Sequence, residues 1–238
     1  MTDADIILPV CATNSHCHLL ASMAMRTLRA STDARIIVLA NNTPDESRRF
    51  ALERECGLLG LDYLYVGGPF SISKLFNEGA AMGMRKYIAY ATSDVIYFPG
   101  WLDNIIELWE MSPDYFALCS YSFDINNNPC ARQSVEPIKL VQNTHNPSSG
   151  VIVLKRESGY KWDETFPLWE IDTDFLYYVE AHNLKCGYCL NARCDHLIDG
   201  VKAHIDLAVN FGLTSDQFYK DSKAAVRKKS GDRYKGGA

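Results

Sequence analysis

Short apolar runs that alternate with helical patterns constrain the fold of this chain more than any other feature of its sequence. Four such runs of five or six residues lie at residues 5–10, 35–40, 61–66 and 87–91. Runs of this kind are typical of strands that are buried on both faces. Apolar residues recur at helical spacing over residues 16–30, 73–85 and 102–109. Alternating strands and helices predict an α/β fold with a mostly parallel central sheet flanked by crossover helices.

The second half of the chain is less regular. Residues 121–148 are rich in Asn, Pro and Ser, which predicts a long loop or an interrupted lobe. We expect strands over 150–154 and 185–190, a helix over 171–182, and helical turns over about 206–229. No internal repeat is present. The sequence therefore predicts one large domain over residues 1–200, followed by a helical, basic extension over residues 201–238.

The charges are distributed unevenly along the chain. The 238 residues carry a formal net charge of −5, yet the segment from Lys220 to Ala238 has seven basic and two acidic side chains. An acidic body with a basic tail is unlike a general nucleic-acid-binding protein, in which the fold itself presents a basic face. The tail suits either a solvated terminus or a clamp for a phosphorylated ligand.

Several protein classes lose support from the sequence. No apolar window approaches the roughly 18 residues of a membrane span, and no basic segment precedes an apolar stretch at the N-terminus. Eight Cys are scattered without a disulfide-scaffold pattern, so we expect reduced thiols and a cytoplasmic location. Dinucleotide-binding, P-loop and serine-hydrolase motifs are absent.

One spacing invites a zinc site. Cys186 and Cys189 form a CxxC pair that is followed by Cys194 and His196. Residues three apart in a strand point to opposite faces, however, so the two members of the pair would not converge on one ion. We therefore favour a role in the core for these cysteines.

The expected ligand site lies at the carboxyl ends of the strands, where open α/β sheets bind their ligands. The segments that follow the strands are polar or glycine-rich: Cys11–Ser15, Asn41–Asp45, Gly67–Phe70 and Thr92–Asp94. Asp94 lies between two apolar runs, where a carboxylate is costly to bury unless it is paired or binds a cation. A helix cap or a loop aspartate is the alternative interpretation.

Five segments together resemble one family. A turn over residues 38–45 is similar to V-D-N-G-S-T-D, and residues 77–83 are similar to N-x-G-x-x-x-G. Residues 92–102 are similar to an N-x-D metal motif followed by P-x-W-L. Residues 159–164 and 171–175 are similar to G-x-F-D-E and E-D-x-D, and a lone histidine, His196, comes later. In these motifs and in their order, residues 4–200 or so resemble the family-2 glycosyltransferases, which have the GT-A fold and an inverting mechanism.

The resemblance implies a GT-A fold with a donor half over about residues 1–100 and an irregular acceptor half over about 101–200. It implies a nucleotide-sugar donor, an acceptor that is a glycan, a small molecule or a nucleic acid, and a divalent cation held by Asp94 and His196. Mn²⁺ or Mg²⁺ would stabilise the departing diphosphate and prefers hard oxygen ligands. The implied donor-binding residues are Pro9, Cys11, Thr13, Asn41, Asn77, Thr92 and Ser93.

The resemblance also assigns the catalytic base and the acceptor contacts. Asp172 occupies the base position, in the first turn of the helix expected over 171–182, where the helix dipole favours an ionised carboxylate. Asp174 is the second choice for the base and Glu170 the third. Such a carboxylate can deprotonate an acceptor hydroxyl, although an aspartate that only stabilises the helix is the alternative. The implied acceptor-binding residues are Trp101, Trp169, Glu170 and Asp174, of which Trp169 is suited to stack on a sugar or base.

The chain departs from the family pattern at three acidic positions, which hold Ala40, Thr92 and Ile171. These losses weaken nucleoside and ribose contacts more than metal or base chemistry. Three hypotheses follow: a metal-dependent inverting glycosyltransferase, a non-catalytic nucleotide-sugar or glycan-binding module, and a glycosyltransferase that modifies nucleic acid with help from the basic tail.

Overall fold

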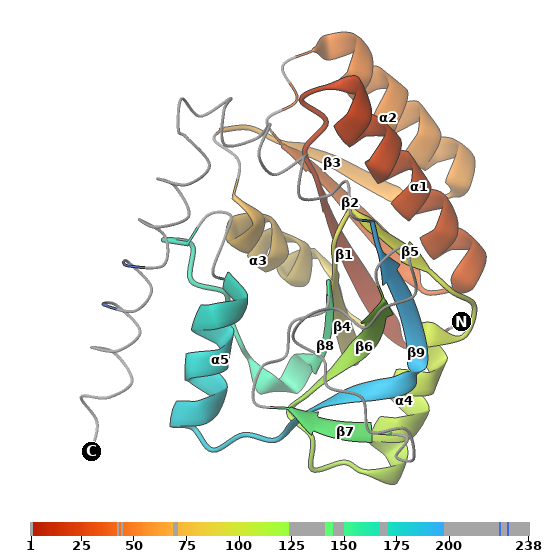
Figure 1. The fold of residues 1–238 in the computed structure, drawn as a ribbon. Helices are drawn as coiled ribbons and strands as arrows, with labels where there is room; N and C mark the ends of the chain where they lie inside the picture. The colour runs from red at the N-terminus through yellow and green to blue at the C-terminus, as the bar shows by residue number, and fades with distance from the viewer. Residues whose placement is uncertain are drawn as a thin grey trace.

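The computed structural model describes residues 2–41, 43, 45–68, 71–123, 141–144, 150–166 and 171–197, together with Ala224 and Lys228. These residues form a nine-stranded sheet with helices on both faces (Figure 1). The strands are β1 (Ala4–Val10), β2 (Arg35–Asn41), β3 (Asp62–Val66), β4 (Tyr87–Ala91), β5 (Val95–Tyr97), β6 (Ala117–Phe123), β7 (Val141–Thr144), β8 (Val151–Lys155) and β9 (Cys186–His196). The helices are α1 (Ser15–Ser31), α2 (Glu46–Leu59), α3 (Ile72–Met82), α4 (Trp101–Met111), α5 (Ile171–Ala181) and the short 3₁₀ helix η1 (Arg156–Ser158).

The first four predicted strands form the parallel part of the sheet, in the order β3-β2-β1-β4. Helices α1 and α2 pack on one face, where Met25 and Leu52 belong to the same hydrophobic cluster as Leu8 of β1. Helix α3 packs on the other face, where Phe76 and Ile7 belong to the same cluster. Because both faces are covered, β1 is buried along its whole length, which explains its continuous apolar run.

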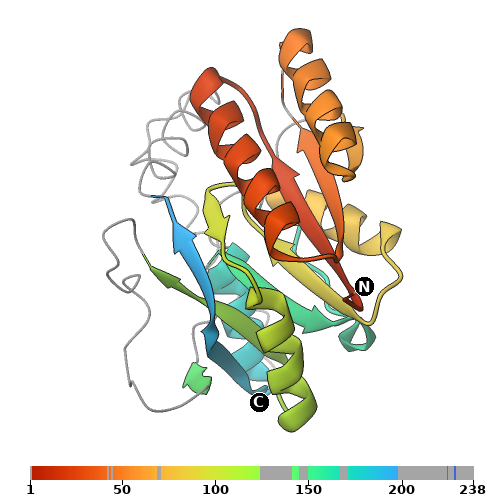
Figure 2. The same ribbon diagram turned by 90° about the vertical axis from the view of Figure 1, so that its right-hand side faces the viewer.

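The rest of the sheet mixes both strand directions. Strand β8 lies antiparallel between β4 and β6, and β6 pairs with β9 in parallel. Strands β5 and β7 each pair antiparallel with β9. The prediction of an α/β fold is confirmed, with the uninterrupted parallel order confined to the first half. All strands except β5, β7 and β8 share one direction, and in Figure 2 the arrowheads of β1 and β9 point toward the same upper part of the view.

Two boundaries in the second half were predicted wrongly. Residues 121–123, which we placed in the long loop or interrupted lobe, belong to β6, and residues 141–144 within the same region form β7. The strand expected to end at 190 continues to His196 as β9. Cys186 and Cys189 belong to different core clusters, as expected for residues three apart in a strand.

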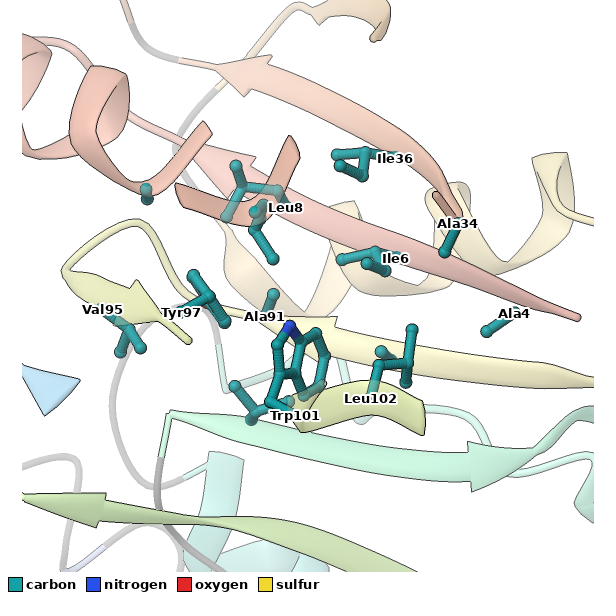
Figure 3. Close-up of a cluster of buried hydrophobic side chains, with 14 of the residues drawn as sticks. Ala4, Ile6, Leu8, Ala34, Ile36, Ala91, Val95, Tyr97, Trp101 and Leu102 are labelled. Atoms are coloured by element: carbon teal, nitrogen blue, oxygen red, sulfur yellow. The ribbon is translucent and has the colours of Figure 1, made fainter. Parts of the chain in front are cut away.

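Trp101 is a core residue, which corrects its assignment as an acceptor contact. Its side chain is fully buried and lies among Leu8, Ala91 and Tyr97 in the cluster drawn in Figure 3. The indole N–H donates a hydrogen bond of 3.1 Å to the hydroxyl of Ser31. An indole without exposed area offers no face to a ligand.

Two predicted acceptor contacts, Trp169 and Glu170, lie outside the described residues, as does nearly all of the basic extension. Ala224 and Lys228 are helical. Among the described residues, no helix combines the length and the hydropathy that crossing a bilayer requires.

Candidate active site

The sheet has its topological switch point between β1 and β4. The chain builds outward from β1 through β2 to β3 and then returns to place β4 on the other side of β1. Within β1, only Ala4–Ile7 pair with β4, so Leu8–Val10 extend past the last β4 pair and pair with β2 alone. Ligands of open α/β sheets bind in the crevice that forms at such a point. Pro9 lies in this extended part of β1 as a buried strand residue.

The structure brings Asp94 and His196 together beside this switch point. Asp94 follows β4 by three residues, and β5 begins at the next residue. His196 ends β9 and pairs with Val95, which sets its ring next to the aspartate. The Nε2 atom of His196 lies 3.4 Å from Oδ2 of Asp94, and the two side chains are 31% and 9% exposed. The peptide N–H of Leu197 also donates to the carbonyl of Asp94.

This pair fits a divalent cation that takes its remaining ligands from a substrate. A carboxylate oxygen and an imidazole nitrogen are both ligands for Mn²⁺, and Mg²⁺ commonly uses one or two carboxylates plus phosphate oxygens. Across the described ranges, no group of three or more His, Cys, Asp or Glu side chains gathers as a closed metal cage. The arrangement therefore suits an open site, in which phosphate and water oxygens complete the coordination.

A buried tyrosine fixes the turn that carries Asp94. The hydroxyl of Tyr97 accepts a hydrogen bond of 3.1 Å from the N–H of Thr92 and donates one of 2.8 Å to the carbonyl of the same residue. Burial holds the pKa of Tyr97 well above its usual range, so the hydroxyl stays protonated and keeps its role as donor. The two bonds close the turn from β4 into β5 and set the direction of the aspartate.

Gly150 is part of this site and was not singled out in the sequence. Its φ of 78° lies in the left-handed region that glycine adopts readily. A Cβ here would come within 2.8 Å of Cγ2 of Val95 and 3.2 Å of Oγ1 of Thr92. It would also lie 3.8 Å from the ring of His196. The only signal in the sequence was a glycine at the start of an expected strand.

The hydroxyl of Thr92 is engaged by the protein. It donates a hydrogen bond of 3.2 Å to the carbonyl of Gly150 and so joins β4 to the start of β8. Ser93, the next residue, is partly exposed between Thr92 and Asp94. Of the two predicted donor contacts in this turn, Ser93 is therefore the better placed to meet a ligand.

The loop after β1 forms the other wall of the switch point. Cys11 is almost fully buried and Thr13 is partly exposed. The N–H of Ala12 donates to the hydroxyl of Thr43, and Nη1 of Arg48 donates to the carbonyl of Thr13 at 2.7 Å. Arg48 was not identified from the sequence, because its helical position in α2 gave no sign of a contact with this loop.

Asn41 is a structural residue at the end of β2. It is 1% exposed, and its amide donates to the carbonyl of Val66 at 2.7 Å. Longer bonds reach the carbonyls of Gly67 and Gly68. The side chain thus anchors the loop that follows β3, which limits what it can offer a donor nucleotide.

Asn77 also serves the fold. Its amide donates to the carbonyl of Trp162 at 2.9 Å and to Glu164 at 3.0 Å, and its oxygen accepts from the N–H of Trp162 at 2.9 Å. Both ends of the side chain therefore hold α3 to the segment before α5. Its predicted contact with a donor would require these bonds to break.

The first turn of α5 contains both predicted aspartates. Asp172 is partly exposed, and its Oδ1 accepts a hydrogen bond of 3.0 Å from the N–H of Thr173. Asp174 is 3% exposed and faces the protein interior. The helix and its acidic first turn agree with the sequence. The side chain of Asp172 is exposed enough to meet an acceptor molecule, whereas the side chain of Asp174 is not.

Comparison with known proteins places the fold. No family model and no curated protein matches the sequence. Among solved structures, the crystal structure of GalNAc-T7 with UDP, GalNAc and Mn²⁺ superposes with a TM-score of 0.65 at 9% sequence identity. The match covers 82% of this chain and 43% of that protein, so this chain spans less than half of its length. The fold is therefore the GT-A type, a Rossmann-like α/β sheet flanked by helices.

Proposed function

We propose that this protein is a glycosyltransferase that uses a nucleotide sugar and a divalent cation. The observation that carries the proposal is the pair formed by Asp94 and His196, whose facing atoms lie 3.4 Å apart at the carboxyl edge of the sheet. The similar fold of GalNAc-T7, crystallised with UDP, GalNAc and Mn²⁺, supports a nucleotide-sugar donor.

Asp94 and His196 are the residues that would hold the cation. When bound, it supplies positive charge to the diphosphate that leaves with the nucleoside. Tyr97 and Gly150 hold the turn around Asp94, so the carboxylate is oriented before the donor binds. Preorganised charge of this kind contributes more to rate than charge that must rearrange during the reaction.

The donor would lie across the switch point, between the loop after β1 and the turn after β4. Thr13 and Ser93 are partly exposed on these two walls, and Cys11 is almost fully buried in the first. Pro9 and Thr92 are buried or engaged near the walls, whereas Asn41 anchors the loop after β3 and Asn77 holds α3 to the segment before α5. In this proposal these four residues make no direct contact with the nucleotide.

Asp172 is the proposed base, which would make the reaction inverting. A base must reach the acceptor hydroxyl and stay ionised, and the first turn of α5 favours an ionised carboxylate through the helix dipole. Trp169 and Glu170 precede this turn in the sequence and remain proposed acceptor contacts. Replacement of Asp172 by Asn should abolish transfer and leave donor binding unchanged.

A non-catalytic binding module is the second candidate. It is favoured by the engaged side chains of Asn41 and Thr92 and by Ala40, which is fully buried and supplies no carboxylate for the nucleoside. A module of this kind would bind the donor without turnover. A nucleic-acid acceptor is a third possibility that depends on the basic tail, and steep salt dependence lost on deletion of residues 220–238 would support it.

The test measures thermal stability with nucleoside diphosphates and nucleotide sugars, each with and without Mn²⁺. A ligand at about 100 times its dissociation constant adds roughly 2.7 kcal/mol, a shift on the order of 5–10 °C for a domain of this size. We expect a metal-dependent shift that is lost in His196→Ala and kept in His182→Ala, whose histidine is exposed at the end of α5. Absence of any shift would refute donor binding, and a shift without release of nucleoside diphosphate would favour the binding module.

A further inference from the structure

A second group of side chains lies on β9 beside the candidate metal pair. The guanidinium carbon of Arg193 lies 4.6 Å from the ring centroid of Phe98 and 5.1 Å from that of Phe123. Phe98 directly follows β5 and Phe123 ends β6, so the three residues come from three neighbouring strands. We call Phe98, Arg193, Phe123 and the adjoining Asp195 the aromatic–arginine platform.

An irregularity in β9 produces this arrangement. Ser120 of β6 pairs with Cys189, but the next residue, Tyr121, pairs with Arg193. Residues 190–192 are thus an insertion in the ladder, and the carbonyl of Asn191 accepts a hydrogen bond from Asn104 instead. Bulges of this kind redirect side chains and are frequent next to active sites. Without the insertion, a different residue of β9 would lie opposite Tyr121.

The platform is held in one geometry. Asp195 accepts hydrogen bonds from Nε of Arg193 at 3.0 Å and from Nη2 at 2.8 Å, so one edge of the guanidinium is bound by the carboxylate. The rings of Phe98 and Phe123 lie beside the same guanidinium. A planar fork fixed in this way loses little further entropy when it forms another bond. The Arg193 side chain is nevertheless 43% exposed, and both phenylalanines are partly exposed.

The charge of the platform indicates what it would bind. The carboxylate of Asp195 balances the guanidinium, so the pair offers polar groups with little net charge. A phosphate would favour a cation without such a partner. A neutral ring that carries hydroxyl groups and an apolar face suits the pair better, because its hydroxyls meet the polar atoms and its C–H groups meet the phenylalanines.

The platform lies at the same end of β9 as the proposed reaction centre. Asp195 immediately precedes His196 and pairs with Ile96 of β5 and Phe123 of β6. In the strand order, β9 is separated from β1 by β4, β8 and β6, so the platform lies toward the side of the sheet away from the loops after β2 and β3. Neighbouring residues of a strand point to opposite faces, so Asp195 and His196 leave opposite faces of β9 at the same carboxyl end of the strand.

We propose that the aromatic–arginine platform binds a neutral pyranose ring of the acceptor. The role as an acceptor site rests on the proposed glycosyltransferase function, whereas binding of a saccharide does not require it. The competing interpretation is a purely structural staple that ties β5 and β6 to β9, and the experiment separates the two.

The experiment measures binding of methyl glycosides of common neutral hexoses and N-acetylhexosamines to the full chain by saturation-transfer NMR, without donor or metal. Arg193→Lys keeps the charge but removes the planar fork, and Phe123→Leu keeps an apolar side chain but removes the ring. Each should weaken saccharide binding about tenfold, the equivalent of about 1.4 kcal/mol. The matched control is Arg26→Lys, whose guanidinium pairs with Glu55 at 2.6 Å on the surface of α1. It should leave binding unchanged.

Two results would overturn the proposal. The first is that no glycoside binds, and the second is that both platform variants bind like the unaltered protein. A structural staple would instead lower the melting temperature of Arg193→Lys and Phe123→Leu without changing affinity at a temperature where both are folded. The saccharide experiment contains neither donor nor metal, so saccharide binding can be observed even if no nucleotide binds. Failure of the platform proposal can therefore be told apart from failure of the proposed glycosyltransferase function.

Discussion

An aspartate is buried at each end of the sheet, and the two carboxylates have different partners. At the amino end, the side chain of Asp5 is fully buried, and its Oδ2 accepts from Arg156 at 2.8 Å and from the N–H of Arg85 at 2.8 Å. At the carboxyl end, Asp94 faces the imidazole of His196 at 3.4 Å, and that imidazole is 31% exposed.

The amino end is closed by its packing. Arg156 also donates to the carbonyls of Arg85 and Ala80, so its guanidinium is enclosed by backbone acceptors. A Cβ on Gly83 would overlap both Asp5 and Arg156. The Arg156 side chain is still 26% exposed, so the difference from the carboxyl end lies in the hydrogen bonds that already engage its donors. Burial alone therefore does not mark a functional carboxylate, because the role depends on whether the partner's own hydrogen-bonding groups are already engaged by the protein.

The largest effect should come from breaking the closed end. Arg156→Ala leaves Asp5 as a buried charge without its main partner, and disruption of such a pair costs about 3–5 kcal/mol. Urea unfolding would measure the loss. Arg35→Ala is the control, since this exposed arginine lies 4.0 Å from Asp5 and pairs mainly with Asp62. Surface pairs contribute about 1 kcal/mol or less. Equal losses in both variants would contradict the picture of a closed end.

The next effect concerns the glycine at the open end. Gly150→Ala forces alanine into a left-handed conformation and places its Cβ against Val95. The backbone strain and the steric contact each lower the unfolding free energy by about 1–3 kcal/mol. Gly159→Ala is a matched control, because Gly159 also has a positive φ of 63° but no atom within 4 Å of its Cβ. We expect Gly150→Ala to be the more destabilising variant and to weaken the Mn²⁺-dependent shift. Identical unfolding free energies would show that contact with Val95 is unimportant.

The sequence predicted the parallel half of the fold well for a physical reason. Strands such as β1 and β2 are covered on both faces, so they appear as uninterrupted apolar runs. Strand β6 was assigned partly to a loop because Ser120 and Ser122, although fully buried, break the apolar pattern. The end of β9 was missed because its insertion interrupts the period of two.

The site was predictable only in part. Asp94 stood out as a carboxylate between apolar runs, whereas its partner His196 came from the family resemblance. Tyr97 and Gly150 act through contacts that depend on how β4, β5 and β8 meet, which no local pattern records. Trp101 was assigned to the acceptor because its place in a motif carries no information about which way the indole points.

A smaller effect should follow from loosening the turn at the open end. Tyr97→Phe removes the acceptor of the Thr92 N–H and the donor to its carbonyl, which costs about 1–3 kcal/mol where a buried group is left without a bond. The Mn²⁺-dependent shift should also decrease, since the turn orients Asp94. Tyr63→Phe is the control: its hydroxyl is buried and makes no hydrogen bond within the described part of the chain. A loss of stability in Tyr63→Phe as large as in Tyr97→Phe would refute a specific role for the Tyr97 hydroxyl.

The smallest effect on stability should come from the residue most important for function. Asp94→Asn preserves the shape of the side chain and removes a carboxylate that lies at the end of an apolar strand, so the desolvation cost of the charge disappears. We expect the unfolding free energy without ligand to change by less than about 1 kcal/mol, while the Mn²⁺-dependent shift disappears. Urea unfolding and thermal shifts on the same sample would measure both quantities. A loss near that of Arg156→Ala would mean that Asp94, like Asp5, belongs to a closed structural pair, and the contrast between the two ends of the sheet would fail.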